Sequence, residues 1–194
     1  MTEQPTQEGL QIKQQNCKNS KNVSLILMNT TDPKLWDIIL IQEPYLYPDS
    51  KITITSPHWY PIYLLGDPND NKPLSSLILV STQLTSGLLQ QIQIKSHLIT
   101  AITLMLPSMT IDIYDIYNTP ILDEALIHLQ TWLHHNPHPL DISTIWAGDF
   151  NKHNALWTGP NHPRQCQDSN TDLLIQLLAQ KHLDLQLPAN TPTY

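Results

Sequence analysis

The 194-residue sequence predicts a single α/β domain in which mixed β-sheets are covered by helices. Three observations support this fold class: apolar runs of strand length, three segments with apolar residues at helical spacing, and short strands separated by turn residues between them. A chain of this length can bury a substantial core. The periodicity leaves two architectures open, namely two sheets packed face to face with helices outside, and an ordinary three-layer fold.

The amino-terminal part of the domain is expected to form a strand and then a helix. Residues 1–9 are polar and predict a flexible tail, so that the domain would span 10–194. Residues 10–16 alternate apolar and polar side chains, which predicts a short half-buried strand. Residues 20–30 have helical periodicity, with Ser20 as the predicted N-cap. The buried face of this helix is predicted to carry Val23, Ile26 and Leu27.

A continuous apolar run, 38–41, predicts a strand that is covered on both faces. Pro44 prevents this strand from continuing as a central one. Pro, Asn and Asp are frequent over residues 50–75, which indicates loops around short extended pieces. Four strands then follow at the spacing of an antiparallel series. They are predicted over residues 74–82, 88–96, 97–106 and 110–118.

The last third of the chain predicts two amphipathic helices around a buried strand. The helices fall over 121–136 and 168–183, and the strand falls over 140–150. Ser169 or Asn170 is predicted to cap the second helix. The apolar face of the first helix is predicted to consist of Leu122, Ala125, Leu126, Leu129 and Leu133.

Composition excludes several classes of protein. The net charge of −7 argues against a broad basic surface that wraps nucleic acid, although a metal ion could supply positive charge in a small cleft. With only 5 Gly, the chain contains neither G-x-x-x-x-G-K nor G-x-G-x-x-G, so the common nucleotide-binding loops are excluded. The chain begins without the features of a signal peptide, lacks an apolar run of membrane-spanning length, and has two cysteines. We therefore expect an intracellular protein, for which a nuclear location would be compatible.

Polar side chains stand at or just past the carboxyl ends of the predicted strands. If these strands are neighbours, the side chains converge on one rim, where oxygen-bearing groups could bind Mg²⁺. Such an ion can polarise a phosphoryl oxygen and stabilise a departing alkoxide. The residues placed in this way are Asn16, Glu43, Tyr117, Asn118, Asp149 and Asn151.

Asp149 and Asn151 in the stretch "IWAGDFNKHNALW" suggest a particular chemistry. Their spacing of two residues puts both side chains on one face of an extended segment. The acid can orient or deprotonate a water molecule, and the neutral amide can hold a phosphate oxygen without repelling the nucleophile. This combination favours phosphodiester hydrolysis, whereas a pair of acids would favour glycoside hydrolysis.

Four stretches together resemble the endonuclease/exonuclease/phosphatase family, in particular the apurinic-endonuclease-like nucleases of non-LTR retrotransposons. They are "LQIKQQNCKNS", "DIILIQEPYLYPD", "IDIYDIYNTP" and "WAGDFNKHNALWTGP", in the order of the family. "IQEPY" and "GDFNKHNALW" favour the retrotransposon branch over the DNase I-like and lipid-phosphatase branches. The resemblance covers nearly all of the chain after residue 9. It implies a four-layer sandwich of two mixed β-sheets flanked by helices.

The resemblance also implies roles for these residues in a hydrolase that cleaves DNA. Asn16 and Glu43 fall on the residues that bind Mg²⁺ or Mn²⁺ in the family. Tyr117 falls on the tyrosine that faces the phosphate, and Asp149 and Asn151 fall on the water-orienting and phosphate-binding pair. The expected partners are DNA as the substrate and a reverse transcriptase domain in the full element, with no membrane. The residues expected to contact the substrate are Asn118, His153 and Trp157.

The sequence departs from the family pattern near its end. In the family, an "S-x-I-D" strand and a terminal Ser-Asp-His complete the site, whereas "LPANTPTY" matches only the segment before them. We therefore expect a domain that lacks its carboxyl-terminal strands, with impaired activity, since such a His can contribute orders of magnitude in rate. The alternative is a non-catalytic remnant of a mobile-element endonuclease. A small-molecule or lipid phosphatase of the same family is a more distant third.

Overall fold

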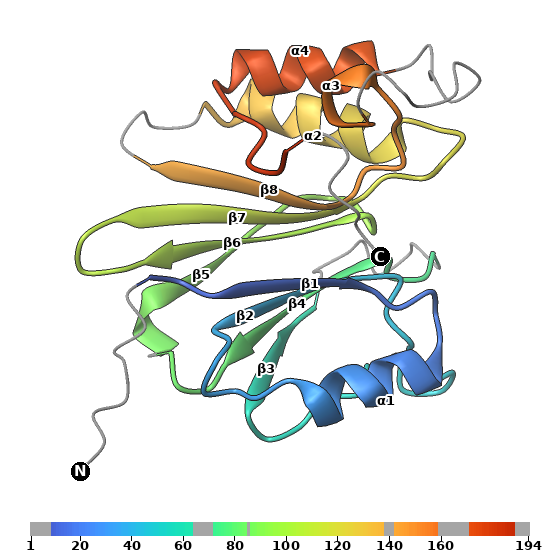
Figure 1. Cartoon of the computed structure of the whole chain (residues 1–194), viewed down its shortest axis with the longest axis vertical. Helices are drawn as coiled ribbons and strands as arrows, with labels where there is room; N and C mark the ends of the chain where they lie inside the picture. The colour runs from blue at the N-terminus through green and yellow to red at the C-terminus, as the bar shows by residue number, and fades with distance from the viewer. Residues whose placement is uncertain (1–8, 64–71, 85, 138–141, 159–170, 189–194) are drawn as a thin grey trace.

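The computed structural model contains two mixed four-stranded sheets that face each other, with helices on their outer sides (Figure 1). This arrangement selects the face-to-face architecture from the two that the periodicity left open. The structure describes residues 9–63, 72–84, 86–137, 142–158 and 171–188.

The first sheet is formed by the amino-terminal strands and has the order β1-β2-β4-β3. β1 is parallel to β2, and β4 is antiparallel to both β2 and β3. The helix α1 lies outside this sheet, and the hydroxyl of Ser20 caps it by accepting from the backbone N–H of Val23. The elements are β1 (Ile12–Asn16), α1 (Lys21–Thr30), β2 (Ile38–Gln42), β3 (Trp59–Ile62) and β4 (Ser76–Ser81).

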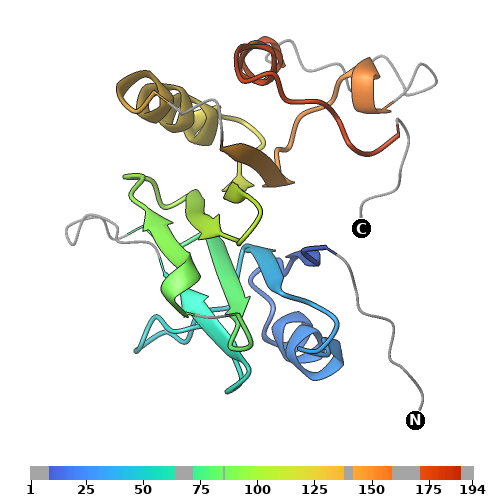
Figure 2. The ribbon, with the colours of Figure 1, turned by 90° about the vertical axis from the view of Figure 1, so that its left-hand side faces the viewer.

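The second sheet has the order β5-β6-β7-β8. β5, β6 and β7 form an antiparallel series, and β8 is parallel to β7. The helices α2 and α4 lie on the outer side of this sheet, opposite to α1 (Figures 1 and 2). The elements are η1 (Ser86–Leu88), β5 (Leu89–Ile92), β6 (Ile99–Met105), β7 (Thr110–Tyr117), α2 (Glu124–His135), β8 (Ser143–Asp149), α3 (Ala155–Thr158) and α4 (Asp172–Gln180).

Alternation along the central strands divides the buried side chains into three apolar layers. On β2, Ile38 and Leu40 point into the space between the sheets, whereas Ile39 and Ile41 pack toward α1. On β7, odd-numbered residues such as Ile113 face the first sheet, and even-numbered ones pack under α2 and α4. Each fully buried Ile or Leu contributes roughly 1.5–3 kcal/mol to the free energy of unfolding.

Several expectations about burial were wrong. Ile26 and Leu122 are 61% and 60% exposed, because the first lies on the outer side of α1 and the second precedes α2. The predicted buried strand over 140–150 is only half-buried, because β8 pairs with β7 alone within the described residues.

The predicted cap of the last helix also differs. α4 begins at Asp172, and its N-cap is Thr171. Ser169 and Asn170 lie outside the described residues, as does the predicted tail up to residue 8. Over the part of the chain that the structure describes, no helix has the length and apolar character needed to cross a bilayer.

Candidate active site

The carboxyl ends of four strands bring the predicted polar residues to one rim of the sandwich. Asn16 ends β1, and Tyr117 and Asp149 end the parallel strands β7 and β8, where they are register partners. Two hydrogen bonds cross from one sheet to the other. The amide of Asn16 donates to Oδ2 of Asp149 over 3.0 Å, and the hydroxyl of Tyr117 donates to Oε1 of Glu43 over 3.1 Å.

We call this group the rim cluster. It consists of Asn16, Glu43, Tyr117, Asn118, Asp149 and Asn151. All of these residues are half-buried except Asn118, which is fully buried. The structure therefore brings together six of the eight site residues predicted from the sequence, at an edge that solvent reaches.

The backbone before Asp149 can be formed only by glycine. Gly148 has a φ of +139°, and a Cβ at this position would lie 1.9 Å from the carbonyl oxygen of Ile116 on β7. Strands β7 and β8 therefore approach closely just before the rim. The carboxylate of Asp149 is held on both sides, because Oδ1 accepts from the backbone N–H of Asn151 over 3.1 Å while Oδ2 accepts from Asn16.

Glu43 also has an unusual backbone conformation, with a φ of +46°. Its backbone N–H donates to the carbonyl of Ser75 over 2.9 Å, and its carbonyl accepts from the N–H of Asn19 over 2.8 Å. Asn19 and Asn151 are left-handed too, with φ values of +52° and +49°. Such conformations cost about 1–3 kcal/mol each and gather at functional sites, where surrounding contacts hold them.

The surroundings of Tyr117 raise the pKa of its phenol. Burial raises the pKa of its phenol to about 12, and the negative charge and hydrogen bond of Glu43 and the charge of Asp149 add to the effect. The phenol therefore stays protonated at neutral pH. It remains a hydrogen-bond donor that can serve a carboxylate or a phosphate oxygen.

Asn118 braces the loop that follows β8. Its backbone N–H donates to the carbonyl of Asp149 over 2.8 Å, and its side-chain amide donates to the carbonyl of Phe150 over 3.2 Å. In return, the amide of Asn151 donates to the carbonyl of Asn118 over 2.7 Å. The buried Oδ1 of Asn118 has no hydrogen-bond partner within the described structure. Asn118 thus fixes the position of Asn151 relative to Asp149.

The other two predicted residues do not take part in these hydrogen bonds. His153 is exposed in the loop after β8. Trp157 lies on α3, packs against the apolar layer under α2 and α4, and donates from its indole N–H to the carbonyl of Lys152 over 2.8 Å. Their contact with the substrate stays a prediction.

Sequence reasoning missed two residues that support the rim cluster. Asn19 reaches Oε1 of Glu43 with its amide at 3.5 Å. Lys152, inside the motif, forms a 2.6 Å ion pair with Asp123, in which the two side chains are 1% and 11% exposed. No local pattern indicates that this lysine is buried, because its partner lies in the segment that leads into α2.

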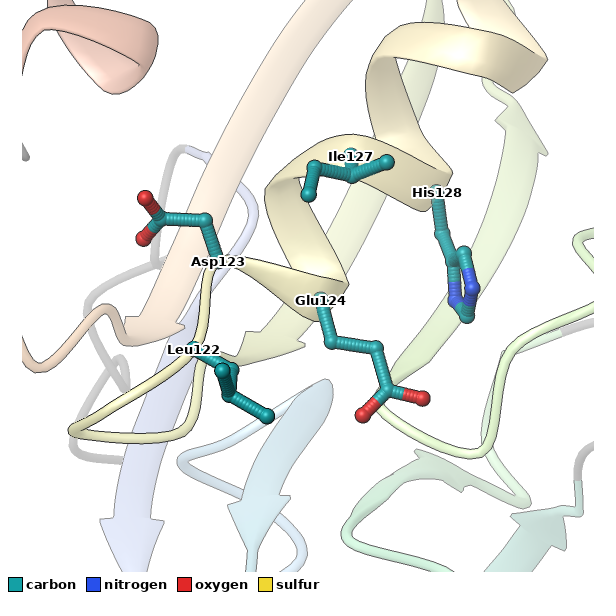
Figure 3. A pocket seen from close by; sticks show the side chains of 5 residues that line it. All are labelled: Leu122, Asp123, Glu124, Ile127 and His128. Carbon is teal, nitrogen blue, oxygen red and sulfur yellow. The ribbon is translucent and has the colours of Figure 1, made fainter.

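A pocket lies at the start of α2, and its lining shares no residue with the rim cluster. Figure 3 shows that Asp123 points to the other side of the helix start from Glu124 and His128. The carboxylate of Asp123 does not cap α2, since it pairs with Lys152. The lining residues are Leu122, Asp123, Glu124, Ile127 and His128.

The donor set of the rim fits a hard divalent cation. Glu43 and Asp149 provide carboxylate oxygens, and Asn16 provides an amide oxygen. Within the described residues, no three His, Cys, Asp or Glu side chains converge as a self-contained metal cage. Mg²⁺ does not need such a cage, because it is often bound through one or two carboxylates together with water and substrate phosphates.

The two facing mixed sheets with outer helices form a DNase I-like endonuclease/exonuclease/phosphatase fold. Residues 111–194 match the model of the family described as "Endonuclease-reverse transcriptase". The matched range contains Tyr117, Asp149 and Asn151, whereas Asn16 and Glu43 precede it. The resemblance and the four-layer architecture predicted from the sequence are thus confirmed.

Three solved structures are similar to the chain. The endonuclease domain of TRAS1, a telomere-specific non-LTR retrotransposon, is 18% identical with a TM-score of 0.71, over 96% of this chain and 77% of that domain. An endonuclease/exonuclease/phosphatase family protein from Leptotrichia buccalis C-1013-b is 14% identical with a TM-score of 0.51, over 89% and 73% of the two chains. SmcL has the same identity and TM-score, over 94% and 72%. No match was found among curated proteins.

Proposed function

We propose that the rim cluster is the active site of a metal-dependent endonuclease that hydrolyses phosphodiester bonds in DNA. The observation that carries this proposal is a pair of carboxylates that accept hydrogen bonds across the sandwich. Glu43 accepts from Tyr117, and Asp149 accepts from Asn16. The match of residues 111–194 to the endonuclease-reverse transcriptase family supports the retrotransposon type.

Glu43 and Asn16 would hold Mg²⁺ or Mn²⁺ at this rim. A divalent cation bound there would polarise a phosphoryl oxygen and stabilise the departing alkoxide. Asn19 keeps Oε1 of Glu43 oriented, since its amide lies 3.5 Å from that oxygen. The strained backbone of Glu43 then serves to turn its carboxylate toward the rim rather than along the strand.

Asp149 would orient and deprotonate the attacking water. Both of its carboxylate oxygens already accept hydrogen bonds, so the side chain is fixed before substrate arrives. Asn151 uses one N–H of its amide for the carbonyl of Asn118, and its second N–H would hold a phosphate oxygen. The neutral phenol of Tyr117 would donate to another phosphate oxygen.

Further parts of the proposal concern the substrate and a partner domain. His153 and Trp157 follow Asn151 and would contact the DNA around the scissile bond. A reverse transcriptase domain would act with the nuclease in the full element. The hydrogen-bonded cluster formed by the described residues consists of carboxylates, amides and a phenol.

Nicking of supercoiled plasmid with Mg²⁺ tests this function. Glu43→Ala and Asp149→Ala should each lower the rate by at least about 10²-fold, because each removes a charge that the transition state needs. Glu124→Ala is the matched control, since Glu124 forms an exposed ion pair with Lys72 away from the rim and its loss should leave nicking unchanged. Equal residual nicking in all four proteins would reject the proposal.

Thermal melts with and without Mg²⁺ separate the nuclease from a non-catalytic remnant. A ligand that binds only the folded state raises the melting temperature, and Glu43→Ala should abolish the shift. A rise in melting temperature with Mg²⁺, without nicking of any DNA substrate, would favour the non-catalytic remnant. Hydrolysis of a phosphomonoester with no plasmid nicking would instead favour the phosphatase alternative.

A further inference from the structure

A row of polar side chains crosses the apolar space between the sheets directly behind the rim. At its centre is Asp115 on β7, which is completely buried. Its Oδ1 accepts from the side-chain amide of Gln42 on β2, and its Oδ2 accepts from the backbone N–H of Leu77 on β4 over 3.2 Å. The row continues to β1, since the amide of Gln14 donates to Oε1 of Gln42 over 3.1 Å. Such a network between apolar layers is costly unless every member is satisfied.

The hydrogen bonds of Ser76 indicate the protonation state of this carboxyl group. The hydroxyl oxygen of Ser76 lies 2.7 Å from the carbonyl oxygen of Asp115 and 2.9 Å from its Oδ2. It also accepts from the backbone N–H of Thr100 over 3.0 Å. A hydroxyl carries one proton and a carbonyl oxygen carries none, so one serine proton cannot make both short contacts into linear hydrogen bonds. A proton on Oδ2 of Asp115 satisfies the second contact.

We propose that Asp115 is held as a neutral carboxylic acid that donates to the hydroxyl of Ser76, and that it positions the Tyr117–Glu43 pair. In this arrangement Ser76 donates to the carbonyl of Asp115 and accepts from both Oδ2 and Thr100, which uses its full hydrogen-bonding capacity. The positioning role rests on the proposed nuclease function, whereas the neutral state of the acid does not.

Burial supports the neutral state. It raises the pKa of Asp115 to about 8, although the side-chain amide of Gln42 and the backbone N–H groups of Leu77 and Ile41 favour the charged form and oppose the rise. The groups that contact the carboxyl from β2 and β4 are amide, hydroxyl and backbone N–H groups, all of them neutral. No countercharge is therefore supplied at these contacts, and ionisation would place a bare charge between the sheets.

The connectivity explains how Asp115 would position the rim. Asp115 and Tyr117 are two residues apart on β7 and therefore point to the same side, toward the first sheet. Gln42, which donates to Asp115, immediately precedes Glu43. Asp115 therefore anchors both partners of the rim hydrogen bond. It lies two residues before Tyr117 on β7, and it binds Gln42, the residue before Glu43. Loss of that anchor would let the sheets shift and lengthen the contact between Tyr117 and Glu43.

Stability as a function of pH tests the neutral acid, with Asp115→Asn as the variant. The Asn side chain is neutral, has the same shape and can still accept from Gln42 and donate to Ser76, but its Nδ2 cannot accept from the backbone N–H of Leu77, which adds a destabilisation that does not depend on pH. The pKa of Asp115 is raised from 3.8 to about 8 on folding, so wild type should lose stability as the pH rises through this interval while the variant does not. The melting temperature of Asp115→Asn minus that of wild type should therefore increase by several degrees as the pH rises from 3.8 to about 8. A constant difference would overturn the neutral state.

The rate of plasmid nicking tests the positioning role. Asp115→Leu and Ser76→Ala should each nick at least about tenfold more slowly than wild type. Asp115→Asn should nick at the wild-type rate at neutral pH. Above about pH 8, where Asp115 ionises, the nicking rate of wild type should decline and that of Asp115→Asn should not. Asp112→Asn is the matched control, because Asp112 is a buried acid of the same strand that binds Thr103 over 2.6 Å, and it should leave the rate unchanged.

The outcomes separate the claims. Wild-type rates in both Asp115→Leu and Ser76→Ala would overturn the positioning role. If Asp115→Leu does not fold, Ser76→Ala and the pH–rate profile of Asp115→Asn still decide it. If no protein nicks DNA at all, the proposed function fails, whereas the melting experiment still establishes whether Asp115 is neutral.

Discussion

The hydroxyl of Tyr117 donates to Oε1 of Glu43 over 3.1 Å, and this bond joins the end of β7 in one sheet to the residue that follows β2 in the other. The phenol of Tyr117 has a pKa of about 12 and stays protonated, so it donates this hydrogen bond and the carboxylate of Glu43 accepts it. The rim thus depends on how the two sheets are placed against each other. A small shift between the sheets would change both partners at once.

Tyr117→Phe should leave the fold intact and slow plasmid nicking. The substitution removes one hydroxyl from a half-buried position, so the free energy of unfolding should fall by about 1 kcal/mol. The rate should fall by about 10²-fold, as is typical when one donor to a developing negative charge is lost. Single-turnover nicking and thermal melts measure the two effects separately.

Tyr114→Phe provides the matched control on the same strand. Tyr114 is completely buried on the opposite side of β7, and its hydroxyl has no hydrogen-bond partner within the described residues. Removal of this unsatisfied group should leave nicking unchanged and keep or raise the melting temperature. Equal rates in Tyr117→Phe and Tyr114→Phe would contradict a catalytic role for Tyr117.

Local elements could be predicted from the sequence, whereas their pairing could not. The run 38–41 has the composition of a strand covered on both faces, and β2 is indeed buried between two neighbours. The four strands over 74–118 were expected to form one antiparallel series. β4 instead joins β2 and β3 in the first sheet, and only β5, β6 and β7 form the series. Strand partners are set by contacts between distant segments, which periodicity does not encode.

The same distinction holds for the candidate site. Asn16 and Asp149 could be placed at strand ends from the sequence, but their hydrogen bond joins residues 133 positions apart and needed the fold. Asp115 left a trace in the sequence, since in "IDIYDIY" it occupies the same alternating row as Ile111 and Ile113. An acid in a row of core positions indicates a buried polar network. Lys152 left no such trace, because nothing local distinguishes a buried lysine in a loop from a solvated one.

Gly148→Ala should destabilise the domain and impair the rim. The added Cβ would collide with the carbonyl of Ile116, and the φ of +139° is unfavourable for any residue with a side chain. We expect the free energy of unfolding to fall by at least about 2 kcal/mol, because β8 must move away from β7. Nicking should fall as well, since Asp149 follows directly.

Gly87→Ala is the control for this change. A Cβ at Gly87 would meet nothing within 4 Å, and the residue lies in η1. The free energy of unfolding of the Gly87→Ala variant should differ from that of wild type by less than about 1 kcal/mol. Urea denaturation of the two variants measures the comparison. Equal stability of Gly148→Ala and wild type would show that the close approach of β7 and β8 is not required.

Lys152→Met and Lys72→Met compare a buried ion pair with an exposed one. The ammonium of Lys152 lies 2.6 Å from Asp123 with 1% of its side chain exposed, so its loss leaves a buried carboxylate without its cation and should cost about 3–5 kcal/mol. Lys72 is also 2.6 Å from its partner, Glu124, but its side chain is 52% exposed, and its loss should cost at most about 1 kcal/mol.

Because Asp123 also accepts from Asn118, Lys152→Met should loosen the Asp149–Asn151 loop and slow nicking, while Lys72→Met should not. Urea denaturation and plasmid nicking of both variants check this, and equal losses of stability would show that burial of the Lys152 pair does not govern its contribution.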